Sequence, residues 1–135
     1  EDGFRELKEE LGIEIDIQHS RHIGIFRNLA TRGGYINREF CNVFLVKSYL
    51  DLDSLVMQHG EVLAVSEYKV KDLISLFERN DGCAYPISST IKTKPSPLTI
   101  QKMCNWKERC LTSKYYLRVF LCAHDYLNNK EIITL

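Results

Sequence analysis

Carboxylate side chains crowd a short stretch near the start of the chain, where residues 5–13 read RELKEELGI. At helical spacing Glu6, Glu9 and Glu10 share one face, because residues three and four apart are neighbours on a helix surface. Like charges at these spacings repel each other weakly. A hard divalent cation such as Mg²⁺ or Mn²⁺ prefers oxygen ligands and would offset that repulsion. The pattern therefore indicates either a metal site or a charged helix face exposed to solvent.

A helix over residues 4–11 would position these carboxylates. Its residue types favour helix, and none of them breaks one. Gly12 follows the last periodic residue, where a helix commonly ends in a left-handed residue. The opposite side of this helix carries a narrow apolar stripe, which we expect to be buried and which consists of Phe4, Leu7 and Leu11.

The order of residues in this stretch is similar to a known motif. From Arg5 to Ile13 the chain matches every specified position in the second half of the Nudix box, G-x5-E-x7-R-E-U-x-E-E-x-G-U, in which U is a bulky apolar residue. The chain therefore resembles the Nudix hydrolase family, and the resemblance favours the metal site over the solvated helix. The first half of the box would lie before residue 1, so we expect an N-terminally incomplete domain.

The resemblance implies a metal-dependent hydrolase of a nucleoside diphosphate linked to another group, or of a similar small organic diphosphate. Water attacks a phosphorus atom, and Mg²⁺ or Mn²⁺ offsets the negative charge and acidifies the water. By position, Glu9 and Glu10 would be the main metal ligands, and Glu6 a further ligand or the catalytic base. Arg5 would hold the carboxylates in place. In the family this arginine pairs with the first glutamate of the box, whereas here Glu9 lies one helical turn away from it.

A further metal-binding carboxylate usually comes from outside the box. Glu39, at the start of a long apolar segment, is the candidate that we assign to the metal site. Glu61 and Glu67 are alternatives. For each of the three taken singly, a solvated strand end is the simpler interpretation.

The segments REFCNVFLV and EVLAVSEYKVKDL resemble the Nudix branch that includes isopentenyl-diphosphate isomerase. True isomerases carry W-x-E-H-E where residues 35–39 of this chain read YINRE. Asn37 replaces a metal-binding glutamate, Arg38 replaces the histidine, and Glu39 alone is kept. We therefore rank a hydrolase above an isomerase. A catalytically inactive Nudix-like binding module is the third hypothesis.

The composition narrows the class of partner. Eighteen basic and eighteen acidic residues balance, which gives no electrostatic case for binding nucleic acid or an anionic membrane. No apolar run approaches the length of a membrane span. The five cysteines are odd in number and lack C-x-x-C spacing, which favours free thiols in a reducing compartment, the cytosol or the nucleus. The oligomeric state is not predicted.

The order of elements predicts an α/β fold. We expect a strand over residues 22–30, a turn over 31–35 and a returning strand over 37–50, whose apolar centre indicates a central strand covered on both faces. A further strand over 61–70 and a helix over 70–80 follow. The Nudix resemblance implies an α/β/α sandwich around a mixed sheet, with its first strands missing from this chain.

Three regions are expected along the chain. Residues 1–82 would form the partial Nudix domain, 83–97 a loop, and 98–135 a helical C-terminal extension. Helical patterns in the extension cover roughly 98–110 and 114–128. We favour packing of these helices against the domain over a role in binding a partner.

Overall fold

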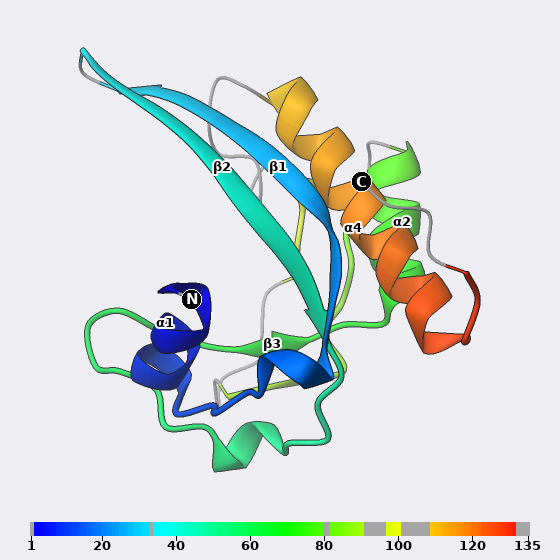
Figure 1. The fold of residues 1–135 in the computed structure, drawn as a ribbon. Helices are drawn as coiled ribbons and strands as arrows, with labels where there is room; N and C mark the ends of the chain where they lie inside the picture. Colours follow the sequence, from blue (N-terminus) through cyan, green and yellow to red (C-terminus); the bar gives the residue numbers. More distant parts are fainter. Residues whose placement is uncertain (1, 33, 80–81, 91–96, 101–108, 132–135) are drawn as a thin grey trace.

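The computed structural model describes residues 2–32, 34–79, 82–90, 97–100 and 109–131 (Figure 1). Helices and strands are both present, which confirms an α/β chain. The long elements are α1 (Asp2–Leu11), β1 (Ser20–Arg32), β2 (Tyr35–Val46), α2 (Val70–Arg79) and α4 (Arg109–Leu127). The short ones are the 3₁₀ turns η1 (Ile17–His19) and η2 (Leu52–Ser54) and the two-residue strands β3 (Ser66–Glu67) and β4 (Ser88–Ser89).

Strands β1 and β2 form the long antiparallel hairpin that the sequence predicts. Their register runs from Ser20 opposite Val46 to Arg32 opposite Tyr35, with one irregularity between His22 and Gly24. Gly34, at the turn, has a φ of 85°, a conformation that glycine adopts without steric cost. The hairpin confirms both predicted strands and their connection.

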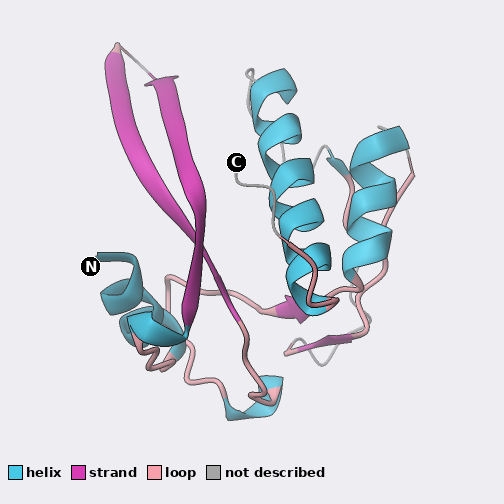
Figure 2. Cartoon of the chain, turned by 45° about the vertical axis from the view of Figure 1, so that its right-hand side comes forward, coloured by secondary structure: helices cyan, strands magenta, loops and turns pink. Residues whose placement is uncertain are grey.

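Helices α1 and α4 lie on opposite faces of this hairpin (Figures 1 and 2). On one face Phe4 of α1 meets Phe44 of β2, with ring centroids 5.5 Å apart. On the other face Phe26 of β1 stacks on Tyr115 of α4 at 4.0 Å. Because side chains alternate along a strand and Phe26 lies opposite Cys41, Phe26 and Phe44 must occupy different faces. The arrangement therefore has helices on both sides of a strand pair.

The main apolar core lies between α2 and α4. Leu76, Phe77, Ala84 and Ile100 are at most 9% exposed and form one cluster. Half-buried side chains pack around it, among them Tyr116, Leu117 and Phe120 of α4. The predicted helix over 70–80 is confirmed by α2, whose apolar face supplies Leu76 and Phe77. Helix α4 confirms the predicted helix over 114–128, and it packs against the rest of the chain as expected.

The sheet differs from the expectation. In the part of the chain that the structure describes, both sheets are two-stranded and antiparallel, so no mixed sheet is found there. The described residues do not show β2 as a central strand, because β2 pairs with β1 alone there and residues 43–46 are only half-buried. The further strands were expected before residue 1, so the central position stays a prediction. The predicted strand over 61–70 shrinks to β3, and the predicted loop contains β4, its partner. The two strands are short and lie more than 20 residues apart in the sequence, so no periodic pattern revealed their pairing.

The predicted helix over 98–110 lies largely outside the described residues. Among those that are described, no helix has the length and apolar character needed to cross a bilayer.

Candidate functional site

Helix α1 carries the predicted site residues and confirms the predicted helix. It covers Asp2–Leu11, with its apolar residues on the side that meets β2. The expectation that this stripe would be buried is only partly met. Phe4, Leu7 and Leu11 are half-buried, and no residue of α1 is fully buried. The described chain covers one side of α1 loosely and leaves its charged side open.

The end of α1 is fixed by backbone contacts with a distant segment. Gly12 takes a φ of 68° and donates a hydrogen bond to the Lys8 carbonyl, which ends the helix in a left-handed residue as predicted. The backbone N–H groups of Val56 and Gln58 donate to the carbonyls of Leu11 (3.1 Å) and Glu10 (2.8 Å). These bonds satisfy carbonyls that a helix end leaves without an intrahelical partner. They also hold the carboxylate-bearing helix against the 55–58 segment.

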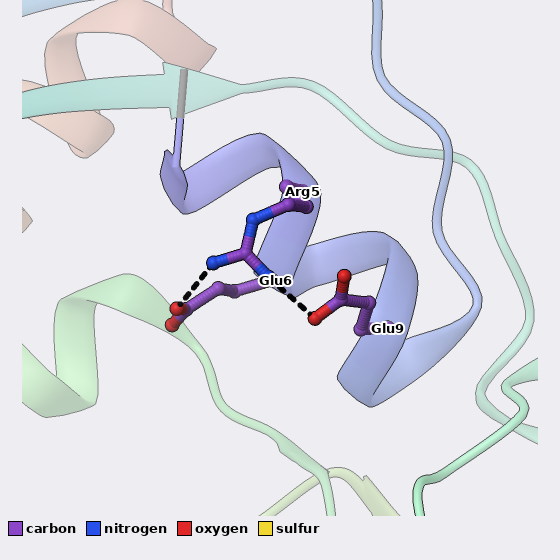
Figure 3. A network of polar contacts seen from close by, with 3 residues as sticks. All are labelled: Arg5, Glu6 and Glu9. Carbon is purple, nitrogen blue, oxygen red and sulfur yellow. Dashed lines mark hydrogen bonds and ion pairs between the residues drawn. The ribbon is translucent and has the colours of Figure 1, made fainter.

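Arg5 bridges two of the predicted metal ligands (Figure 3). Its Nη1 donates to Glu9 Oε2 at 2.6 Å, and its Nη2 donates to Glu6 Oε1 at 3.2 Å. The hydrogen bond to Glu9, followed by the charge of Glu9, raises the pKa of the Arg5 guanidinium above its ordinary value. All three side chains are more than half exposed, so water screens these ion pairs and the side chains can change rotamer at low cost. Arg5 therefore joins Glu6 and Glu9, the partners that this chain provides, and its role in a metal site stays a prediction.

The remaining charges of α1 are arranged separately. The Lys8 side chain points away from the carboxylate face and forms an ion pair with Glu14, in which Nζ lies 2.7 Å from Oε1. Glu10 is half-exposed, beside the backbone bond from Gln58. Lys8 therefore does not neutralise Glu6, Glu9 or Glu10.

A pocket of about 690 Å³ lies between α1 and β2. From α1 it is lined by Asp2, Phe4, Glu6 and Leu7, and from β2 by Glu39 and by the alternating residues Phe40, Asn42, Phe44 and Val46. This volume falls within the range of pockets that hold small organic ligands. The Asn42 side chain forms a 3.1 Å hydrogen bond with the His22 ring. His22 is the cross-strand partner of Phe44. The pocket thus combines an apolar, partly aromatic wall with carboxylates from the predicted metal helix.

The structure places Glu39 at the border of the pocket that Glu6 also lines. The Glu39 carboxylate accepts a 3.3 Å hydrogen bond from Asn28, directly opposite on β1. This pair belongs to the face of the hairpin that carries Phe26 and Cys41, so strand alternation directs Glu39 away from the face of Phe44. The alternatives are more distant in the fold. Glu67 lies in β3 and accepts a bond from Ser88, and Glu61 is exposed in a turn.

Within the described ranges, no three histidine, cysteine, aspartate or glutamate side chains converge closely enough to hold a metal ion. The donor chemistry nevertheless fits a hard cation, because Glu6, Glu9 and Glu10 are carboxylates on one short helix. With Arg5 bonded to Glu6 and Glu9, these carboxylates would have to rotate before they could converge on an ion. Their assignment as ligands stays a prediction.

Comparison with known proteins points to the same family as the motif. The chain is 27% identical, over 124 residues, to an uncharacterized Nudix hydrolase of Clostridium acetobutylicum. The match covers 91% of this chain and 60% of that relative. This similarity supports the Nudix family. The resemblance to the isomerase-like branch stays a prediction. No protein-family model matches the chain, and no solved structure does.

The motif could not reveal the wall of the pocket. Phe40, Asn42 and Phe44 alternate along β2 and therefore share a face, a pattern that is visible in the sequence. Which of the two faces meets α1 depends on tertiary packing. The contact between Phe4 and Phe44 decides it.

Proposed function

We propose that this chain belongs to a metal-dependent hydrolase that cleaves a diphosphate linkage in a small organic substrate. The observation that carries the proposal is the α1 helix, on which Arg5 gathers carboxylates and Glu6 lines a ligand-sized pocket. The similarity to a Nudix hydrolase supports it. The chain spans about 60% of the length of that relative, so the activity is proposed for the full natural protein.

The residues of α1 divide the work. Glu9 and Glu10 are the proposed main ligands of Mg²⁺ or Mn²⁺, with Glu6 and Glu39 as further candidates. Held by these carboxylates, the ion would supply positive charge and would make the attacking water more acidic. Glu6 is the proposed base that accepts a proton from this water, as its carboxylate lines the pocket. The new bond joins the water oxygen to phosphorus, and the bond that breaks joins phosphorus to the bridging oxygen, which leaves with its phosphate.

For a metal ion to bind at this site, Arg5 has to break its ion pair with Glu6 or with Glu9. Its guanidinium occupies oxygens of Glu6 and Glu9 that a metal ion would take. Both partners are exposed, and exposed ion pairs contribute little to stability. Replacing one Arg5 ion pair with a contact to a divalent cation therefore costs little free energy. Arg5 can then remain bonded to the other oxygen of the same carboxylate.

The test is the double substitution Glu9→Gln and Glu10→Gln in the full natural protein. Glutamine keeps size and helix propensity but removes the charge that a hard cation requires. We expect Mn²⁺ binding and phosphate release from a panel of nucleotide and prenyl diphosphates to be lost, with an unchanged circular dichroism spectrum. Glu78→Gln, an exposed glutamate on α2, is the matched control. Turnover that survives the double substitution would refute the metal assignment.

The Arg5 ion pairs also favour a second candidate, a Nudix-like module that binds its ligand without turnover. In that case Arg5 neutralises the carboxylates permanently, and no metal ion replaces it. Such a protein would bind an organic diphosphate equally well with and without Mg²⁺, and would release no phosphate from it.

A further inference from the structure

The two faces of the hairpin differ in how the chain covers them. On one face Phe26 stacks on Tyr115 of α4, and most of the described side chains there are half-buried. On the face of Phe44, α1 covers the end far from the turn, and the turn end projects beyond α1 (Figure 1). The described side chains of this projecting part are all exposed. We call it the outer hairpin face; it consists of Ile25, Arg27, Leu29, Ile36, Arg38 and Phe40.

The apolar side chains of the outer hairpin face form one continuous row. Leu29 lies opposite Arg38. Ile36 and Phe40 lie two residues to either side of that arginine, so both are diagonal neighbours of Leu29, at the spacing of about 7–8 Å that large side chains can bridge. Ile25 is diagonal to Phe40 in the same way. The four side chains are between 39% and 75% exposed, and contiguous apolar surface bordered by polar groups marks an interaction site.

The charges on this side of the hairpin are separated by sign. Arg27 and Arg38 are exposed, and the outer hairpin face contains no acidic residue. Helix α1 lies on the same side and contains more carboxylates than basic groups. In the part of the chain that the structure describes, neither these arginines nor Asp2 and Glu10 form an ion pair. This side of the molecule therefore has a positive end on the hairpin and a negative end at α1.

A surface of this kind is complementary to itself. In a dimer with two-fold symmetry both copies use the same surface, so a contact between two different parts of it occurs twice. The positive end of each copy can then meet the negative end of the other. An anionic lipid surface, or a uniformly acidic protein, would be attracted by the arginines and repelled by the carboxylates of α1. The charge pattern therefore favours a second copy of this chain.

We propose that the outer hairpin face is a homodimer interface. The apolar row packs against the second copy, and Arg27 and Arg38 face the carboxylates on α1 of that copy. Burial of the row supplies the favourable free energy of association, and the charges set the orientation of the two copies. This interface goes beyond the proposed hydrolysis, because it requires neither a metal ion nor a substrate.

The first experiment is sedimentation equilibrium of the full natural protein without metal. We expect a dimer with a dissociation constant in the micromolar range, which becomes weaker as salt screens the charges. A protein that stays monomeric at every concentration would overturn the proposal. Such a result would include the case in which another part of the natural protein covers this face.

A substitution in the apolar row tests which surface associates. Ile25→Thr combined with Ile36→Thr keeps two β-branched side chains in the strands and replaces two exposed methyl-bearing groups with polar ones. We expect it to weaken the dimer about tenfold or more, because the symmetry counts each change twice. Ile87→Thr is the matched control, because Ile87 is 56% exposed and lies outside the hairpin. A dimer that the double substitution leaves intact, or that the control weakens equally, would overturn the proposal.

A charge exchange tests whether the partner is a second copy. Arg38→Glu should weaken the dimer about tenfold, and so should Asp2→Arg, because each places like charges together at two symmetric contacts. The two changes combined should restore the wild-type affinity. Arg21→Glu is the matched control, since Arg21 is exposed on β1 opposite Leu45, on the other face of the hairpin. Weakening that the combination does not relieve, or that the control reproduces, would overturn the pairing.

Two further outcomes separate this interface from its alternatives. Flotation of the protein with vesicles of phosphatidylserine and phosphatidylcholine, lost on Ile25→Thr and Ile36→Thr, would assign the face to a membrane surface and overturn the proposal. A dimer that dissociates on these substitutions would support the interface even if the full protein hydrolyses no diphosphate. Hydrolysis by a strictly monomeric protein would support the hydrolase and refute the interface.

Discussion

Helices α1 and α2 are both ten residues long, yet their side chains meet very different surroundings. Helix α2 buries Leu76 and Phe77 in a cluster that α4 and the 97–100 segment complete. Helix α1 buries no residue fully, and its ordered contacts are ion pairs, an aromatic contact with Phe44 and backbone bonds at its end. One helix is held by apolar packing, and the other by a capped end and exposed charges.

The region that stabilises the chain is therefore different from the region that carries the candidate site. Burial of apolar surface is the largest favourable contribution to folding, so the region between α2 and α4 should dominate stability. Exposed ion pairs contribute little, so Glu6, Glu9 and Glu10 are free to be selected for ligand binding. Substitutions in the core between α2 and α4 should therefore lower the free energy of unfolding much more than substitutions on α1 do.

The largest effect is expected from Phe77→Ala. Phe77 is 6% exposed and contacts the rings of Tyr116 and Phe120, so truncation leaves a cavity. We expect a loss of about 3–5 kcal/mol in the free energy of unfolding, measured by chemical denaturation. Phe40→Ala is the matched control in the site region, where 75% exposure predicts a change within about 0.5 kcal/mol. Similar losses for both would erase the contrast between the two regions.

The elements that the sequence predicted well are those with local causes. Helix α1, helix α2 and the hairpin follow from residue spacing and glycine positions, and each was found. The ion pair between Arg5 and Glu9 follows from their separation of four residues. These features depend on neighbours along the chain, which a single sequence displays.

The features that were missed depend on contacts between distant segments. Strand β3 pairs over two residues with the equally short β4, and that pairing spans more than 20 residues of chain. The half-burial of residues 43–46 reflects which strands lie beside β2, a property that apolar content alone does not determine. The surroundings of Glu39 likewise depend on tertiary structure: its carboxylate accepts a hydrogen bond from Asn28 across the strand pair, and its assignment to the metal site stays a prediction.

The intermediate effect is expected from Gly12→Ala, which tests the capped end of α1. Gly12 has a φ of 68°, and a Cβ atom there would lie 2.9 Å from the Val56 Cβ. Left-handed backbone and a close contact both oppose alanine, so we expect a loss of about 1–3 kcal/mol in thermal or chemical unfolding. Gly3→Ala, inside the same helix with open space around it, should instead stabilise by about 0.5–1 kcal/mol. Equal effects at both glycines would show that the contact with Val56 does not anchor α1.

The smallest effect is expected from Glu14→Gln, which removes the ion pair with Lys8. The hydrogen bond and charge of Lys8 lower the pKa of Glu14 below its ordinary value of 4.5, and Glu14 in turn raises the pKa of Lys8. A lowered carboxyl pKa stabilises the folded chain when the pH is above the ordinary pKa of the carboxyl group. This stabilisation is lost as the pH falls through the folded-state pKa. On the basic side it is lost as the pH rises through the raised pKa of Lys8.

Both side chains of this pair are well exposed, at 62% and 79%, so solvent screens the interaction strongly. We expect Glu14→Gln to lower the melting temperature by no more than about 2 °C at pH 7. The difference should vanish below the folded-state pKa of Glu14, where the wild-type carboxyl is also uncharged, and in 1 M salt, where the Debye length falls to about 3 Å. Melting curves at neutral and acidic pH, with and without salt, measure it. A drop as large as that of Phe77→Ala would mean that an exposed ion pair stabilises the chain as much as a buried ring does, and the expected difference in size between the two regions would fail.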